Sequence, residues 1–428
     1  MGAWANRPLG RIAVGAFILL WIIFAFAFLG GRYSDQEWYS QSVDRFKAWT
    51  SSNYTEVLES AQQEIEDENI APKVGCEVLV SDLQLRLLEE YSQLLKGIRH
   101  VNIWGYLETE NKGDAAIWAA QQMLLSEMGI ESHESCRFLD KGCNAEQFRA
   151  ALEHYKPHSA VVMAGGGNFN DYYWEDQPSR INMINNFPDV PIRAFPQSIH
   201  MTKADRINAT RESFGKHPDL QVAARDQPSY DWLRDNLGQK VLGDGKEVKS
   251  VLVPDIAFMW GNRPDFRRNT KKTHDILILA RDDKEISAGG SKQIPFGTGV
   301  LDLGGRIGNV TYQKVDWKFT HTPGIDRELP EFVDQDEPGK NQRAWAKAVA
   351  GFELLGSAKF VITDRLHGHI MSTIIGVPHV LMDSKLGKNL NFHDTWTQDC
   401  ECTRITDDFE KSLEVARLYF ESIDDGLQ

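Results

Sequence analysis

The residues most suited to chemistry lie in one short stretch in the last third of the chain, residues 360–381. Phe360 to Thr363 is an apolar, β-branched run that predicts a buried strand, and Asp364, Arg365 and His367 follow it directly. Arginine carries a fixed charge and histidine titrates near neutral pH, so these side chains could bind an anion and move a proton on it. A histidine at a helix start can equally be a capping or packing residue, and this stretch alone leaves both interpretations open.

The surrounding pattern indicates how these residues would be positioned. Leu366, Ile370 and Ile374 recur at every fourth position, which predicts a helix packed on a sheet. Gly376 and Pro378 would end this helix before another strand begins. The polar residues would then lie at the carboxyl end of a strand, where open α/β sheets bind ligands, and the free N–H groups of the helix start favour an anion.

Further candidates follow predicted strands in the first half of the chain. Asp114 opens a predicted helix and could be a cap, a general base or an acceptor for a sugar hydroxyl. Glycines after the strand predicted for residues 159–163, including Gly166 and Gly167, would let a backbone approach a ligand closely or would merely permit a tight turn. The Tyr and Trp residues at 172–174 could stack on a sugar or serve packing.

Polar residues also follow other predicted strands. The strand that begins at Val190 leads into Gln197 and Ser198, whose side chains can hold hydroxyl or carboxylate groups, and into His200, a second acid/base or a polar residue at the rim. Arg225 follows the strand predicted for residues 220–224 and so repeats the position of Arg365. The remaining substrate-binding candidates are Asn168 and Arg281.

The length and amino-acid composition fit a globular chain with two sizeable cores, because 42% of the 428 residues are hydrophobic and 25% are charged. A formal net charge of −14 argues against a nucleic-acid partner, and an anionic substrate would need a locally basic pocket. The five cysteines lack zinc-ligand spacing, and His367 and His369 would point apart on a helix. The sequence therefore predicts no metal and no cofactor.

The N-terminal region predicts a membrane anchor. Residues 12–31 form an uncharged, mostly apolar run, and as a helix they would span about 30 Å, the thickness of one bilayer core. Arg7 and Arg11 precede the run, which favours a cytoplasmic N-terminus and a lumenal or extracellular body. A cleaved signal peptide with a cleavage site near Ala27 is the alternative, but the run is longer than a usual signal core.

Acceptor sequons at Asn53, Asn208 and Asn309 agree with a glycosylated domain in the secretory pathway. In that compartment Cys136 and Cys143 could close a small loop, and Cys76 could pair with one of the two cysteines at 400 and 402. The odd number of cysteines leaves at least one thiol unpaired or intermolecular.

We expect five segments along the chain: a cytoplasmic tail (1–11), an anchor (12–31), a stem (32–75), a first α/β domain (76–260), and a second α/β domain with a C-terminal helix (261–428). Residues 261–273 have no pattern and predict an interdomain linker. Residues 283–308 are rich in Gly and Lys and predict a mobile surface loop.

Six short motifs together resemble the polysaccharide pyruvyl transferase family. They are Asn111-x-Gly113-Asp114-x-x-Ile117, Gly165-Gly166-Gly167-Asn168, Phe195-Pro196-Gln197-Ser198, Ala224-Arg225-Asp226, Pro254-Asp255 and Asp364-Arg365-Leu366-His367-Gly368-His369. They occur in the family's order across about residues 100–385. With its predicted anchor, the chain is similar to the eukaryotic Golgi branch, which adds pyruvate ketals to terminal galactose.

The resemblance implies two Rossmann-like domains that face a cleft, as in GT-B glycosyltransferases, in a single-pass type II Golgi protein with a lumenal catalytic domain. It also implies phosphoenolpyruvate as donor and a galactose-terminated glycan as acceptor. The family's functional positions fall on Asp114, Arg225, Arg365, Leu366 and His367. In this interpretation His367 is the acid/base, the two arginines hold the donor, and Asp114 or His200 takes a proton from the acceptor.

Two alternatives remain from the sequence. A GT-B glycosyltransferase with a nucleotide-sugar donor, as in sialyltransferases, would present a phosphate to the same arginines. A non-catalytic lumenal glycan-binding protein could be built on the same fold, although the presence of both arginines and His367 argues against it.

Overall fold

The structure is a computed structural model that describes residues 74–138, 143–243, 247–283, 285–286, 290–320 and 337–424. The predicted tail, the anchor, nearly all of the stem and the sequon at Asn53 lie outside these residues. Within the described part of the chain, no helix has both the length and the apolar character needed to cross a membrane. Residues from Lys73 onward form one compact unit, which contains two β-sheets.

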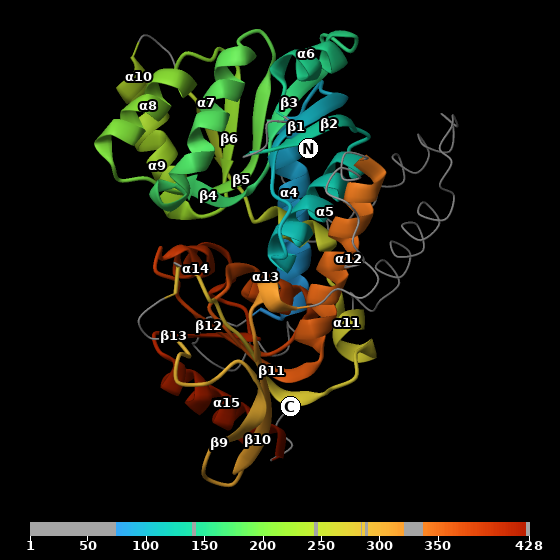
Figure 1. The fold of residues 1–428 in the computed structure, drawn as a ribbon, viewed down its shortest axis with the longest axis vertical. Coiled ribbons are helices and arrows are strands. Elements are labelled where there is room, and N and C mark those ends of the chain that lie inside the picture. Colours follow the sequence, from blue (N-terminus) through green and yellow to red (C-terminus); the bar gives the residue numbers. More distant parts are fainter. Residues whose placement is uncertain are drawn as a thin grey trace, which may run out of the picture. The chain divides into compact units, whose positions relative to one another are not determined.

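The first sheet has the strand order β2-β1-β3-β5-β6-β7, with β4 paired to β5, and its strand pairs are parallel (Figure 1). Its strands are β1 (His100–Tyr106), β2 (Glu131–Arg137), β3 (Ser159–Met163), β4 (Gly166–Asn170), β5 (Ile192–His200), β6 (Leu220–Ala224) and β7 (Lys249–Leu252). β3 is buried along its whole length, as expected for an apolar strand in a parallel sheet covered by helices on both faces.

Most helices of this half connect parallel strands, whereas α4 precedes β1. They are α4 (Cys76–Leu94), α5 (Lys112–Glu127), α6 (Ala145–Glu153), α7 (Gln177–Asn186), α8 (Ala204–Phe214), α9 (Gln227–Leu237) and α10 (Gln239–Leu242), with short 3₁₀ segments η1 (Asp171–Asp176) and η2 (Ile256–Trp260). Asn144 caps α6 and Asp226 caps α9, so each helix begins where a polar side chain accepts from its first turn.

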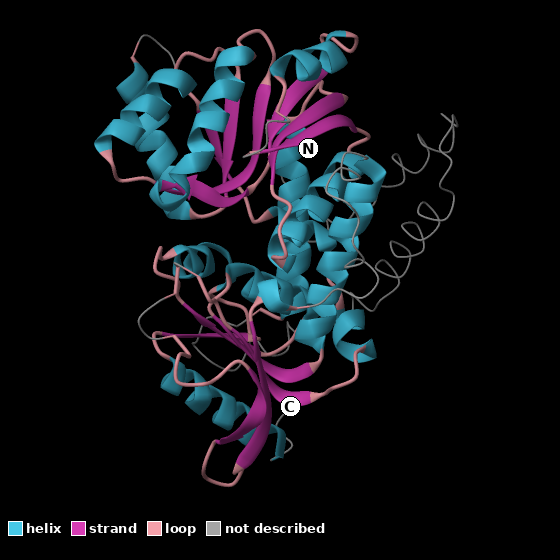
Figure 2. Cartoon of the chain, in the orientation of Figure 1, coloured by secondary structure: helices cyan, strands magenta, loops and turns pink. Residues whose placement is uncertain are grey.

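The second sheet has the order β13-β12-β11-β8-β10-β9 and is parallel except for β9, which runs antiparallel to β10 (Figure 2). Its strands are β8 (His274–Leu279), β9 (Gly297–Asp302), β10 (Asn309–Val315), β11 (Ala358–Thr363), β12 (His379–Met382) and β13 (Thr403–Thr406). The helical segments of this half are α11 (Pro264–Asn269), η3 (Trp317–Phe319), α12 (Glu337–Gly356), α13 (Leu366–Ile375), α14 (Lys388–Phe392), η5 (His393–Thr397) and α15 (Phe409–Asp424). The α/β class and the mainly parallel sheets agree with the sequence-based expectation.

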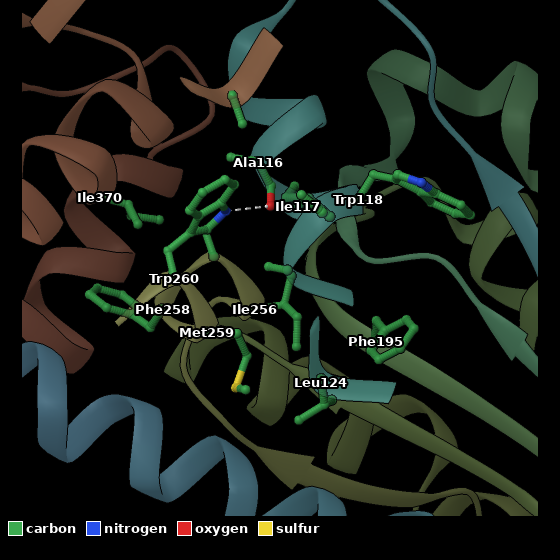
Figure 3. Close-up of a cluster of buried hydrophobic side chains, with 14 of the residues drawn as sticks. Ala116, Ile117, Trp118, Leu124, Phe195, Ile256, Phe258, Met259, Trp260 and Ile370 are labelled. Atoms are coloured by element: carbon green, nitrogen blue, oxygen red, sulfur yellow. Dashed lines mark hydrogen bonds between the residues drawn. The ribbon is translucent and has the colours of Figure 1, made fainter. Parts of the chain in front are cut away.

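The largest apolar cluster is shared by both halves, whereas the composition predicted only two sizeable cores. It joins α4, α5 and η2 to α12 and α13, and two smaller clusters lie against the individual sheets. Figure 3 shows Trp260 of η2 in this shared core, near Ile370 of α13, with its indole Nε1 donating to the Ala116 carbonyl at 3.1 Å. The packing of α12 on α5 adds a polar contact, since Trp118 Nε1 donates to Asn341 Oδ1 at 2.8 Å. The shared core therefore fixes the helix starts that carry the candidate site.

Two local predictions need correction. Residues 283–308 are not simply a mobile surface loop, because they include strand β9 and the buried Glu285, which is 1% exposed. Residues 261–273 are not unpatterned linker throughout, because α11 begins at Pro264, and the backbone N–H of Arg263 donates to the Ile374 carbonyl. In both cases tertiary contacts order a segment whose composition is polar.

The predicted cysteine pairing is confirmed. Cys136 is bonded to Cys143, Cys76 is bonded to Cys402, and Cys400 is a buried free cysteine. The second bridge connects the start of α4 to the segment before β13, and so joins two positions 326 residues apart.

Candidate functional site

Arg225 occupies the first position after β6 and is 1% exposed. Asp226 caps α9 by accepting a hydrogen bond from the Ser229 N–H at 2.9 Å, which fixes the turn that contains Arg225. Nε of Arg225 donates to Ser198 Oγ at 2.8 Å, and Nη1 donates to Asp255 Oδ2 at 2.7 Å. These contacts fix the guanidinium plane and leave Nη2 as the nitrogen directed to a possible ligand.

Asp255 joins Arg225 to His367, which lies in the first turn of α13. Asp255 Oδ2 lies 3.5 Å from His367 Nε2. Burial alone would raise the pKa of Asp255, but His367 and Arg225 outweigh burial and hold this pKa well below its usual range. Asp255 is therefore ionised. Nε2 of His367 is buried and makes no hydrogen bond of normal geometry with the described residues, so its ion-pair contact with Asp255 is the interaction that orients it.

Gly113 brings the start of α5 against His367. Asn111 caps α5 by accepting a hydrogen bond from the Gly113 N–H at 3.0 Å. A Cβ at position 113 would lie 2.5 Å from the Cβ of His367, so only glycine permits this approach. The first half of the chain thus helps to hold an imidazole that the second half supplies.

Lys388 and Arg225 converge on Gly167 in strand β4. A Cβ at position 167 would lie 2.6 Å from Arg225 Nη2 and 3.8 Å from Lys388 Nζ. Burial, together with the positive charges of Arg281 and Arg225 and against the opposing effect of Glu285, lowers the pKa of Lys388 to about 8. Two cations therefore flank a backbone that carries no side chain, which is a suitable arrangement for binding an anion.

Glu285 holds this cationic group together. Its carboxylate forms an ion pair with Lys388, accepts a hydrogen bond from the Tyr173 hydroxyl at 2.8 Å, and lies 3.1 Å from Arg281 Nη2. Arg281 also donates through Nε and Nη2 to the two oxygens of Asp283, each at 2.9 Å. Burial would raise the pKa of Glu285, but Lys388 and Arg281 outweigh burial and lower it, so the carboxylate stays charged.

Arg365 is turned toward another carboxylate. Its Nη2 donates to both oxygens of the buried Asp316 at 2.5 and 2.7 Å, and lies 3.5 Å from Asp283 Oδ2. The structure also brings Lys388 close to Arg225, a cation that was not predicted from the sequence, and contact of Arg365 with the donor stays a prediction.

Comparison with known proteins agrees with this geometry. The family model for polysaccharide pyruvyl transferases matches residues 111–385, which begin at the cap of α5 and include Arg225, Asp255 and His367.

The chain belongs to the polysaccharide pyruvyl transferase family. It is 31% identical to Pyruvyl transferase 1 of Schizosaccharomyces pombe over 345 residues, which cover 79% of this chain and 80% of the relative. It is 24% identical to the putative pyruvyl transferase EpsO of Bacillus subtilis, across 69% of this chain and 84% of that protein. The protein is therefore an enzyme of polysaccharide biosynthesis that transfers a pyruvyl group.

The two residues expected to take a proton from the acceptor lie in different surroundings in this pyruvyl transferase. Asp114 is half-buried in the first turn of α5, next to Gly113, and accepts a hydrogen bond from Thr109 Oγ1 at 2.7 Å. Asn111 is the cap of this helix, so Asp114 is not needed for that purpose. His200 is exposed at the end of β5, where it pairs with Asn170 of β4, and its side chain makes no hydrogen bond with the described part of the chain.

Other predicted substrate-binding residues of the pyruvyl transferase already have protein partners. Asn168 donates to Asp176 Oδ2 at 2.6 Å and accepts from Arg180 Nη2 at 2.6 Å. Gln197 donates through Nε2 to the Ala164 carbonyl at 2.6 Å, while its Oε1 is buried without a hydrogen-bond partner among the described residues. These residues shape the strand ends around the site, and their direct contact with substrate stays a prediction.

Of the last two predicted positions, Gly166 contributes through its backbone and Leu366 through packing. Gly166 in β4 has a φ of 145°, a conformation open to glycine, and pairs with Gln197 across the sheet. Leu366 is the first residue of α13 and is buried in the shared core.

Three residues of the site were not predicted from the sequence. Asp255 belongs to a motif that supported the resemblance but was given no role, although it lies shortly after the end of strand β7. Glu285 was assigned to the predicted mobile loop. Lys388 lies in a polar segment after β12 with no distinguishing spacing, and its contact with Glu285 spans 103 residues of sequence.

Proposed function

We propose that the pyruvyl donor of this enzyme is phosphoenolpyruvate and that the acceptor is a terminal sugar of a glycan, with galactose as the first candidate. The product would be a pyruvate ketal. The observation that carries the proposal is the convergence of Arg225 and Lys388 on Gly167, with His367 coupled to Arg225 through Asp255.

Phosphoenolpyruvate carries a phosphate and a carboxylate, and the cations described above suit such a molecule. Arg225 Nη2 and Lys388 Nζ would share the phosphate, because both lie beside a backbone that a phosphate oxygen can approach. Both cations are fixed by buried carboxylates, so little reorganisation is needed when charge develops on the departing phosphate.

Ketal formation requires a balanced movement of two protons. The C3 methylene of the donor gains a proton, two sugar hydroxyl oxygens form bonds to C2, and the bond from C2 to the phosphate oxygen breaks. The two protons lost by the hydroxyls end on the new methyl group and on the released phosphate. No redox step occurs, so the reaction needs only acid/base groups and cations.

His367 is the proposed acid/base. Its Nε2 is buried 3.5 Å from Oδ2 of Asp255, the carboxylate that also holds the guanidinium proposed to bind the donor. Asp255 would orient the ring, as a carboxylate does for a catalytic histidine. Asp114 is the preferred group for the acceptor hydroxyl over the exposed His200, because it directly follows the glycine that contacts His367.

The acceptor sugar would bind in a surface hollow of about 470 Å³ next to the Arg225 backbone. Trp396 borders this hollow and donates from Nε1 to the Arg225 carbonyl at 2.8 Å. An aromatic ring together with amide and carboxylate groups suits a sugar. The polar side chains of the lining include Gln227, Asn391, Thr395 and Asp394. We expect Trp396→Ala to raise KM for the acceptor while KM for the donor changes little.

The decisive experiment compares donors. The purified body is incubated with a β-galactoside and either phosphoenolpyruvate or a set of nucleotide sugars, while phosphate or nucleotide release and product mass are followed. We expect phosphate release only with phosphoenolpyruvate, an acid-labile product, and almost no turnover by folded His367→Ala. Turnover with a nucleotide sugar alone would replace this proposal with the glycosyltransferase alternative.

We also propose a Golgi location with an uncleaved type II anchor at residues 12–31 and glycans on the lumenal body. Two disulfides support an oxidising compartment, and the side chains of Asn208 and Asn309 are exposed. Expression in a eukaryotic cell should give a membrane-bound protein whose mobility shifts after treatment with an N-glycosidase. A body that is digested by protease added outside intact microsomes would contradict this orientation.

A further inference from the structure

His100, Glu131 and His133 lie together at the amino ends of β1 and β2. His100 and Glu131 are direct partners across the parallel pair. His133 lies two residues after Glu131, so both side chains project from the same face of β2. The topology thus gathers two imidazoles and one carboxylate at one edge of the first sheet.

The ligand atoms of these side chains already have the spacing of a metal site. His100 Nδ1 lies 3.1 Å from His133 Nε2 and 3.5 Å from Glu131 Oε2, and all three ligand atoms lie within 4.8 Å of one another. A tetrahedral zinc ion with bonds of about 2.0–2.1 Å needs neighbouring ligand atoms about 3.3 Å apart. An ion can therefore be accommodated without rearranging the strands.

Tyr155 holds both imidazoles in orientation. Its ring stacks on His100 with a centroid separation of 3.9 Å and an angle of 19°, and on His133 at 4.5 Å and 6°. The two imidazoles thus lie side by side on one aromatic platform, with ring nitrogens directed at each other. Such support fixes the rings before a metal binds, as neighbouring groups do in established metal sites.

We propose that His100, Glu131 and His133 form a structural site for a divalent cation of the zinc type, with water as the fourth ligand. Imidazole nitrogens favour zinc and its neighbours in the first transition row, whereas magnesium prefers six oxygen ligands. No motif spacing could have revealed the site, because His100 is far from the other two residues in sequence and reaches them only through strand pairing.

The site would stabilise the sheet and leave catalysis unchanged. β2 is the edge strand of the first sheet, and a bound ion would tie its start to β1. Arg225 follows β6, and Gly167 lies in β4, which pairs with the carboxyl-terminal part of β5; β1 and β3 separate these strands from β2, and β1 alone, with 7 residues, spans about 20 Å. The ion would thus stabilise the pairing of β1 and β2 at a distance from the candidate active site.

The test uses the purified body after chelator treatment and dialysis. Zinc chloride is titrated by calorimetry, and cobalt chloride is followed by the visible absorption that is diagnostic for tetrahedral coordination. We expect one equivalent of zinc with micromolar or tighter affinity, the tetrahedral cobalt spectrum, no saturable magnesium binding, and a higher Tm with zinc. Pyruvyl transfer should be the same with and without the ion.

Three variants assign the ligands. His133→Ala and Glu131→Gln should each weaken zinc binding at least tenfold and abolish the zinc-dependent rise in Tm, while both proteins stay folded and active. His154→Ala is the matched control, since His154 is exposed and contacts only the edge of Tyr155 among these residues, and it should bind zinc like the wild type. Zinc binding that is absent in the wild type, or that survives unchanged in His133→Ala, would overturn the proposal.

Discussion

Asp255 and His367 come from different halves of the sequence, yet Oδ2 of the first lies 3.5 Å from Nε2 of the second. Asp255 opens η2 after the last strand of the first sheet, and His367 lies in the first turn of α13, after β11 of the second sheet. Because Asp255 also accepts a hydrogen bond from Arg225, one carboxylate couples the proposed donor-binding cation to the proposed acid/base.

Replacing Asp255 by Asn should therefore impair catalysis strongly. The variant keeps the side-chain shape but leaves Arg225 and His367 without their shared negative charge, and loss of one such preorganised group typically costs ~10²- to 10³-fold in rate. Because breaking a buried ion pair costs about 3–5 kcal/mol in stability, Tm must be measured alongside kcat. Asp265→Asn, at a surface ion pair, is the control and should have wild-type activity. Full turnover by folded Asp255→Asn would refute the coupling.

Gly167→Ala tests the approach of the donor. Its Cβ would lie 2.6 Å from Arg225 Nη2, and this guanidinium has little freedom to move because Ser198 and Asp255 hold it. We expect KM for phosphoenolpyruvate to rise at least tenfold. Gly339→Ala adds the same methyl group in helix α12, where the nearest atom is 3.5 Å away, and should leave KM unchanged. Equal KM values in the two variants would argue against a donor at Gly167.

Lys388 should make donor binding depend on pH. Burial lowers its pKa to about 8, so the ammonium group is charged below that pH and loses its charge as pH rises through it. KM for phosphoenolpyruvate should accordingly increase above about pH 8. Lys388→Arg stays charged throughout this range and should flatten that rise, whereas Lys388→Met should have a high KM at every pH. A wild-type KM that is constant from pH 7 to 9.5 would exclude Lys388 from the donor site.

The patterns of apolar and polar residues predicted much of the secondary structure, because they reflect which residues are buried locally. The strands at residues 159–163 and 220–224 have the predicted bounds, and the strand before Asp364 begins two residues earlier than its apolar run suggests. Arg225 and His367 were found by the same logic, since each follows a buried strand. Their coupling through Asp255 could not be inferred, because it depends on contacts between the halves.

The parts that sequence analysis missed share one physical cause. Glu285 and Lys388 belong to polar segments, and composition alone indicates exposure for such residues. Glu285 is buried because several cations and Tyr173 surround it, which is a tertiary property. The orientation of Arg365 toward Asp316 could not be predicted from the sequence for the same reason, since 49 residues separate the two partners.

The bridge between Cys76 and Cys402 gives a prediction about stability. The sulfur atoms of Cys76, Cys400 and Cys402 lie within 4.8 Å of one another, so Cys400 can replace Cys402 as the partner of Cys76. Cys76→Ala should lose the bridge outright and lower the free energy of unfolding by about 2–5 kcal/mol, because the bridge closes a long loop. Cys402→Ala should lose much less, since a bridge to Cys400 can form.

Urea unfolding gives the free energies of unfolding, and mass spectrometry after alkylation of the denatured chains gives the number of free thiols: one in wild type, two in Cys76→Ala and none in Cys402→Ala. Two free thiols in Cys402→Ala, together with an energy loss equal to that of Cys76→Ala, would show that Cys400 cannot take over.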